Sequence, residues 1–75
     1  MPSLRKVSGD EAIRALERLG FKKVRQRGSH VVLKKTTEHE VLGCVVPLHP
    51  ELKIGTLRGI LRQAKTGVDE FLASL

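Results

Sequence analysis

The sequence contains neither tryptophan nor tyrosine, and it has one cysteine and two phenylalanines among its 75 residues. The single thiol, Cys44, excludes a disulfide within the chain and is compatible with a reducing cytoplasm. His30, His39 and His49 stand too far apart to form, with that thiol, the ligand spacing of a zinc site. We therefore expect one domain, residues 1–75, that is held together by packing and uses no metal or cofactor.

Long hydrophobic runs are also missing. The longest are "VVL" and "CVVPL", far below the roughly 20 apolar residues that a membrane-spanning helix needs. The stretch "MPSLRKVS" is basic and lacks the apolar segment of a signal peptide. We therefore expect a cytoplasmic protein with no membrane partner.

Positive charge is concentrated in the first half of the chain. The formal net charge is +6; residues 1–35 hold ten Lys and Arg against three Asp and Glu, and residues 36–75 hold four against five. A basic half on a small domain suits a polyanion such as nucleic acid. The alternative is a solvated, lysine-rich surface, and charge alone leaves both open.

The stretch "SGDEAIRALERLG" predicts a first helix. Ser8 is a good N-cap, and Glu11, three residues later, completes a capping box. Gly20 is expected just beyond the helix end, where glycine accepts a left-handed backbone. The apolar residues follow helical spacing and form one stripe: Ala12, Ile13, Ala15, Leu16 and Leu19.

Three strands are predicted next, over residues 21–27, 29–35 and 41–47. Phe21 and Val24 are the expected apolar anchors of the first strand, and Gly28 and Ser29 form a tight turn after it. Short turns between consecutive strands favour an antiparallel meander.

Two helices are predicted after the sheet. Thr56 is expected to cap the longer one, and Gly67 to cap a short one near residues 68–75. The apolar residues assigned to the two stripes are Leu57, Ile60, Leu61 and Ala64, then Val68, Phe71 and Leu72.

This order predicts an α+β fold, α-β-β-β-α plus a short C-terminal helix, with the helices on one face of a three-stranded antiparallel sheet. The other face is expected to stay open. On the second strand we assign Val31 and Leu33 to the core, which puts His30 and Lys34 on the open face.

His30 lies in "RQRGSHVVLK", at the mouth of a strand between basic residues. An imidazole moves protons near neutral pH, and a neighbouring glycine lets a ligand approach closely. RNA carries its own nucleophile, the 2′-OH, so a histidine can remove that proton without a metal while cations stabilise the transition state. The alternative is an ordinary surface histidine at a strand start.

His49 is a candidate for the second proton-transfer group, although a histidine that merely ends a strand between prolines is the favoured reading. His39, in the acidic turn "TEHE", is expected to be solvated. The candidate RNA-binding residues are Lys22, Lys23, Arg25, Arg27, Gly28, Ser29, Lys34 and Lys35. Both phenylalanines are assigned to the core, so base stacking on aromatic side chains is not expected.

The chain resembles the HicA-type toxins of toxin–antitoxin systems, also called the YcfA family. The resemblance is carried, in order, by "VSGDEAIRALERLGF", "RQRGSHVVL", "VVPLHPELKIGTLRGILRQA" and "VDEFL". The residues "LGCVV" and the acidic turn "KTTEHE" depart slightly from the pattern.

The resemblance implies a double-stranded-RNA-binding-like fold and an mRNA interferase whose important histidine is His30. It also implies a HicB-type antitoxin that covers the active face. We expect a monomer when the antitoxin is absent. Two other functions stay open at this point: a non-catalytic RNA-binding module of the same fold, and a protein-interaction subunit that docks a partner on the sheet.

Overall fold

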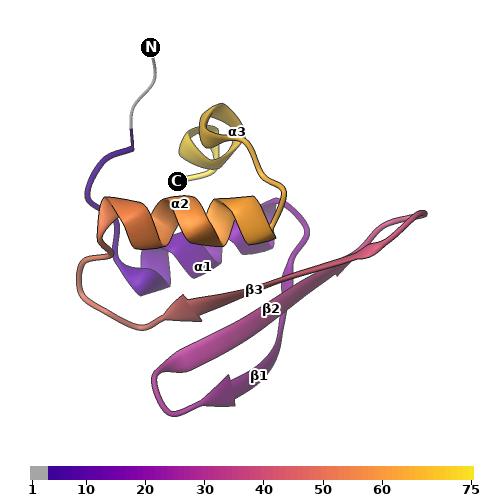
Figure 1. The fold of residues 1–75 in the computed structure, drawn as a ribbon, viewed down its shortest axis with the longest axis horizontal. Helices are drawn as coiled ribbons and strands as arrows, with labels where there is room; N and C mark the ends of the chain where they lie inside the picture. Colours follow the sequence, from indigo (N-terminus) through magenta and orange to yellow (C-terminus); the bar gives the residue numbers. More distant parts are fainter. Residues whose placement is uncertain (1–3) are drawn as a thin grey trace.

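The computed structural model describes residues 4–75, and it has the predicted order of elements (Figure 1). Helix α1 (Gly9–Arg18) is followed by strands β1 (Lys22–Arg27), β2 (His30–Thr36) and β3 (Val41–Pro47), then by helices α2 (Ile54–Gln63) and α3 (Val68–Ala73). The strands form one antiparallel sheet in the order β1-β2-β3. The α+β fold with a three-stranded meander is thereby confirmed.

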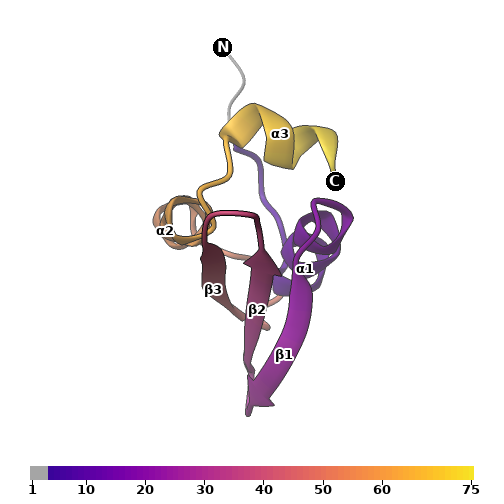
Figure 2. The ribbon, with the colours of Figure 1, turned by 90° about the vertical axis from the view of Figure 1, so that its right-hand side faces the viewer.

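The elements form layers (Figures 1 and 2). Helices α1 and α2 lie over one face of the sheet, and α3 lies on the side of these helices that points away from the strands. Within residues 4–75, no helix lies on the other face of the sheet. The layers enclose one core of buried hydrophobic residues: Val7, Ala12, Ile13, Ala15, Leu16, Phe21, Val31, Leu33, Cys44, Val46, Leu52, Leu57, Ile60, Leu61, Ala64 and Phe71.

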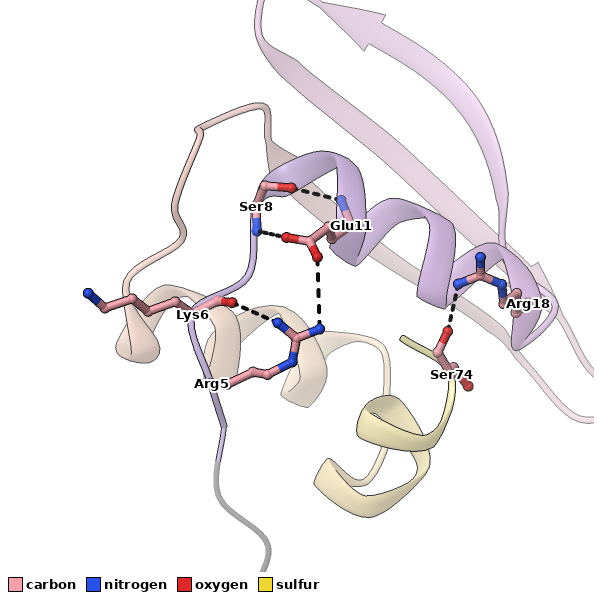
Figure 3. A network of polar contacts seen from close by, with 6 residues as sticks. All are labelled: Arg5, Lys6, Ser8, Glu11, Arg18 and Ser74. Atoms are coloured by element: carbon pink, nitrogen blue, oxygen red, sulfur yellow. Dashed lines mark hydrogen bonds and ion pairs between the residues drawn. The ribbon is translucent and has the colours of Figure 1, made fainter.

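Helix α1 begins as its sequence predicts. The Ser8 hydroxyl accepts a hydrogen bond from the Glu11 amide, and the Glu11 carboxylate accepts one from the Ser8 amide, both at 3.0 Å (Figure 3). This capping box satisfies two of the amides that a helix start leaves without partners. At the other end Gly20 has a φ of +103°, the left-handed conformation expected there.

Two further contacts tie α1 to distant parts of the chain (Figure 3). The guanidinium of Arg18 donates a hydrogen bond to the Ser74 carbonyl oxygen at 2.7 Å. Arg5 lies 3.8 Å from the Glu11 carboxylate. Both contacts are exposed, so they orient the chain ends more than they stabilise the fold.

The β2 assignment is confirmed. Val31 and Leu33 are buried, whereas Val32 is half-buried and His30 and Lys34 are exposed. Because side chains alternate across a strand, His30, Val32 and Lys34 share the open face.

Two local predictions are wrong. Val24 is not an apolar anchor, because the pairing of β1 with β2 shifts between Lys23 and Arg25 and leaves Val24 as a bulge residue that is 53% exposed. Thr56 does not cap α2, because the helix begins earlier, at Ile54, with Lys53 as an N-cap that makes no side-chain hydrogen bond. Phe21 is buried as predicted, immediately before the strand.

The short helix α3 is confirmed, with Gly67 at its N-cap. Phe71 is fully buried and fills the core from the side opposite the sheet. Val68 and Leu72 are half-buried rather than buried, and Val68 packs against the core.

Candidate nucleic-acid interface

The β1–β2 turn is tight and open to solvent. Gly28 has a φ of +59°, the left-handed backbone that the first central residue of a type II′ hairpin turn requires. No atom lies within 4 Å of the place where a Cβ on Gly28 would stand. The Gln26 side-chain amide donates to the Gly28 carbonyl oxygen at 3.0 Å and holds the turn. A ligand can therefore approach the backbone here closely.

His30 is the first residue of β2 and is exposed. It stands opposite Arg27 on β1 and opposite Pro47 on β3. Directly opposed residues in an antiparallel pair point to the same face, with Cβ atoms roughly 4.5–5.5 Å apart. The imidazole and the Arg27 guanidinium thus leave the sheet side by side on its open face.

Four of the six candidate cations share that face with His30. Arg25 stands opposite Val32, and Lys22 stands opposite Lys34. With Arg27, these residues form a basic face on β1 and β2, here defined as Lys22, Arg25, Arg27 and Lys34. Gly28 and Ser29 border it at the turn.

Lys23 and Lys35 lie on the opposite side of the sheet. Lys23 is paired with the buried Leu33 and lines a groove beside α1. Lys35 is half-buried, and its ammonium group lies 5.8 Å from the centre of the Phe21 ring. Lys35 therefore packs on Phe21, and a phosphate that bound its ammonium group would have to replace this cation–π contact.

Apolar side chains occupy the open face next to the cations. Val32 is half-buried, and its β3 partner Val45 is 40% exposed. The face holds no aromatic ring, because Phe21 and Phe71 are both in the core. A nucleic acid on this face would be bound through phosphates and sugars rather than by base stacking on aromatic side chains.

Three segments meet at the His30 end of the sheet. The Leu48 amide donates to the Ser29 carbonyl oxygen at 2.7 Å, and the Gly9 amide donates to the His49 carbonyl oxygen at 2.9 Å. A Cβ on Gly9 would overlap the Pro47 carbonyl oxygen and lie 2.9 Å from the Leu48 Cα. Sequence reasoning assigned no role to Gly9, although a glycine in the first position of a helix is a signal for a close backbone approach.

The other two histidines differ in their surroundings. His49 is exposed and lies two residues beyond Pro47, so its backbone belongs to the same junction as His30. His39 lies in the β2–β3 turn, with its side chain 90% exposed, as predicted. Within residues 4–75 none of the histidine side chains forms a hydrogen bond, and the His39 ring lies 4.0 Å from the Glu38 carboxylate.

Among residues 4–75, Glu11 and Cys44 have shifted pKa values, and both shifts follow from structure. The hydrogen bond from the Ser8 amide lowers the pKa of Glu11 below its ordinary value of 4.5. Burial raises the pKa of the Cys44 thiol to about 11. Cys44 is thus a small buried apolar residue, not a nucleophile.

Residues 4–75 hold no group of three His, Cys, Asp or Glu side chains arranged to bind a metal ion. None of the helices in this range has the length and apolar character needed to cross a bilayer.

The fold and the site define a small α+β domain with one uncovered, basic sheet face and a histidine at the mouth of a hairpin. The model of the family described as "HicA toxin of bacterial toxin-antitoxin" matches residues 9–66. The chain belongs to this family of toxins, and membership implies an antitoxin partner. None of the curated proteins matches the sequence.

Proposed function

We propose that the protein is an endoribonuclease toxin that cuts mRNA, with His30 as its general base. The neutral imidazole accepts the proton of a 2′-OH, and the 2′ oxygen forms a bond to the adjacent phosphorus. The bond from phosphorus to the 5′ oxygen breaks, and that oxygen takes up a proton. The products are a 2′,3′-cyclic phosphate and a 5′-hydroxyl, and no metal is required.

One observation carries the proposal: His30 is exposed beside Arg27, at an open glycine turn, on the only basic sheet face of residues 4–75. A phosphodiester bound by Arg27 would bring its 2′-OH within reach of the imidazole. The guanidinium would also stabilise the charge that builds up on the phosphoryl oxygens in the transition state.

The other cations of the basic face would bind the flanking phosphates. Lys22, Arg25 and Lys34 extend away from His30 along β1 and β2. Their contacts would be insensitive to sequence and sensitive to salt. Lys23 and Lys35 would take part only for an RNA strand that also reaches the helix side of the sheet.

His49 is the candidate for the acid that protonates the leaving oxygen. The support is its place at the junction that holds the His30 turn. Water can supply the same proton, so loss of His49 should slow the reaction less than loss of His30. General acid–base catalysis contributes typically 10²–10⁴-fold, and such an enzyme would be slow.

The antitoxin partner would act by covering this face. We propose a HicB-type antitoxin with acidic side chains for the basic face and apolar ones for Val32 and Val45. Burial of His30 under such a partner would exclude RNA. The toxin would then be silent in the complex and active when the antitoxin is removed.

The test is an RNA cleavage assay in EDTA with wild type, His30→Ala, His49→Ala and His39→Ala. His39 serves as the matched control, because it is an exposed histidine beyond the end of β2 opposite to His30. Circular dichroism checks that each variant is folded. We expect cleavage by wild type and His39→Ala and a loss of at least about 100-fold in His30→Ala. Equal rates for the two alanine variants at residues 30 and 39 would remove His30 from the reaction.

A second candidate is a non-catalytic RNA-binding module. It is favoured by the absence, within residues 4–75, of any side chain hydrogen-bonded to the His30 ring that would orient it. This function predicts salt-dependent binding of RNA that stays intact over hours in protein free of antitoxin.

A further inference from the structure

A groove runs between α1 and β1 on the helix side of the sheet, and it encloses about 230 Å³. Its floor is apolar. Ile13 and Val31 are buried there, and Leu48 is half-buried. The space lies beside the edge strand β1, all of whose residues are exposed.

The walls of the groove are polar and carry both signs of charge. Asp10, Arg14 and Glu17 line it from α1, at the spacing that places residues on one helix face. Lys23 and Gln26 line it from β1. The groove therefore offers hydrogen-bond donors and acceptors around an apolar floor.

The charged walls are not used within the fold. Within residues 4–75, the side chains of Asp10, Arg14, Glu17 and Lys23 make neither an ion pair nor a hydrogen bond. The neighbouring face of α1 differs, because Glu11 and Arg18 are both engaged in contacts that hold the chain (Figure 3). The Gln26 side-chain amide donates one hydrogen bond to the Gly28 carbonyl oxygen, and its side-chain oxygen accepts none within residues 4–75.

The groove lies next to the turn that carries His30, the candidate catalytic residue. Val31, on its floor, follows His30 in β2 on the opposite face of the strand. Leu48, also on the floor, is hydrogen-bonded to the Ser29 backbone. A strand of RNA that crosses the open Gly28–Ser29 turn can thus hold a phosphate at His30 and reach the groove with an adjacent base.

The chemistry of the walls selects a neutral ring with a polar edge. The two carboxylates and the two cations give the walls no net charge, so the walls offer a phosphate no overall attraction, and an aliphatic group would leave their hydrogen-bond donors and acceptors unused. A nucleobase presents apolar faces to the floor and donors and acceptors to the walls. The space is smaller than the roughly 300–1,000 Å³ of pockets for drug-sized ligands, so it fits one base.

We propose that this groove binds a single nucleobase next to the cleaved phosphate and sets the sequence preference of the enzyme. The proposal rests on the function proposed above. Carboxylates accept hydrogen bonds from the exocyclic amines of bases, as they do from cytosine N4. Guanine, adenine and cytosine carry such an amine and uracil does not. The enzyme should therefore cut poorly where uracil occupies this position.

The first experiment maps the cut sites of wild type and Asp10→Asn on a random-sequence RNA pool. The matched control is Asp69→Asn, because Asp69 is likewise an exposed aspartate in the second position of a helix. We expect wild type and Asp69→Asn to disfavour uracil at one position beside the cut, on the order of tenfold. Asp10→Asn should lose most of that discrimination. An unchanged cut-site profile in folded Asp10→Asn would overturn the proposal.

The second experiment does not depend on cleavage. Tetranucleotides with 2′-O-methyl groups, which differ in one base, are titrated into labelled protein while amide resonances are followed by NMR. We expect shifts at the amides of residues 10–17 and 23–26, weakest with uracil and reduced in Asp10→Asn. Such shifts without cleavage by wild type would leave the groove assignment intact and remove the endonuclease function. Cleavage by wild type without shifts at these amides would overturn the groove assignment and leave the endonuclease function intact.

Binding of an antitoxin side chain is the competing use of the groove. An Asp10→Asn variant with weakened antitoxin affinity, but with the wild-type cut-site profile and wild-type NMR shifts, would assign the groove to that partner and overturn the base-binding proposal.

Discussion

The amide of Gly9 donates a hydrogen bond to the carbonyl oxygen of His49 across 2.9 Å, and so fastens the start of α1 to the chain that leaves β3. The same close approach leaves no room for a Cβ on Gly9. Because Leu48 is in turn bonded to Ser29, this contact also supports the turn that carries His30.

Substitution of Gly9 by alanine should therefore destabilise the protein. A Cβ would force the Pro47–Leu48 backbone away, and such overpacking costs typically about 1–3 kcal/mol in the free energy of unfolding. Gly55→Ala is the control, since Gly55 also lies in a first helix turn but has no atom within 4 Å of its Cβ position. It should be neutral or stabilising by up to about 1 kcal/mol. Urea denaturation measures both, and equal effects would contradict the role given to Gly9.

The capping box should make stability depend on pH in the acid range. The folded-state pKa of Glu11 lies below its ordinary value of 4.5. Its charge-dependent stabilisation is therefore fully present above that value and is lost as the pH falls through the lower, folded-state pKa. Glu11→Gln keeps the hydrogen-bonding shape and removes the charge.

Denaturation of wild type and Glu11→Gln from pH 7 to pH 2.5 tests this directly. The wild-type advantage should shrink as the pH falls below about 4.5. Glu38→Gln, at a side chain that is 93% exposed in the β2–β3 turn, should show no comparable change. A constant difference in stability between wild type and Glu11→Gln over the whole pH range would contradict a stabilising role for the Glu11 charge.

Cys44 should be inert in the folded protein. It is buried, and its pKa of about 11 keeps the thiol protonated at pH 8. A thiol reagent such as Ellman's reagent should react with the native protein only as fast as it unfolds, and at once in denaturant. Rapid modification of the native protein at pH 8 would show that the β3 side of the core opens.

Arg27 should contribute to RNA binding through charge. Its removal should lower the slope of the logarithm of the binding constant against the logarithm of salt concentration by about 0.7, the value expected for one lost phosphate contact on a single strand. Arg58→Ala is the control, because Arg58 is an exposed arginine on α2, outside the basic face. The binding is measured with 2′-O-methyl RNA to prevent cleavage. Identical slopes for the two variants would exclude a direct contact at Arg27.

Much of the fold was predictable because local and tertiary preferences agree. Ser8 and Glu11 form a capping box that needs only local contacts, and Gly20 takes a conformation that few other residues tolerate. Val31 and Leu33 were assigned correctly because a strand with one buried face alternates, and β2 is the central strand.

The errors occur where tertiary contacts override local ones. Val24 lies on an edge strand, where a bulge can displace one residue without breaking a second ladder. Helix α2 starts without a capping side chain because Leu52 is already fixed by burial and by a 2.7 Å hydrogen bond to the Val7 carbonyl oxygen. Neither the bulge at Val24 nor the uncapped start of α2 is marked by the residues near it in the sequence.

The candidate site was predictable only in part, because tertiary contacts also decide which side chains meet on the open face. The alternation in β2 placed His30 on the open face, but the bulge in β1 decides which cations join it. Lys23 falls on the helix side and Arg25 on the open face because one residue is inserted between them. The groove beside α1 is invisible to sequence, since it depends on how a helix and an edge strand are spaced.

The most direct test of the central claim is an RNA with a single 2′-deoxynucleotide at a mapped cut site. If His30 activates the 2′-OH, wild-type protein will leave that site intact in EDTA and still cut the unmodified sites. The ends produced there will be 2′,3′-cyclic phosphates. Cleavage at the deoxynucleotide, or products with a 3′-hydroxyl, would show that another nucleophile attacks the phosphorus and would contradict the mechanism.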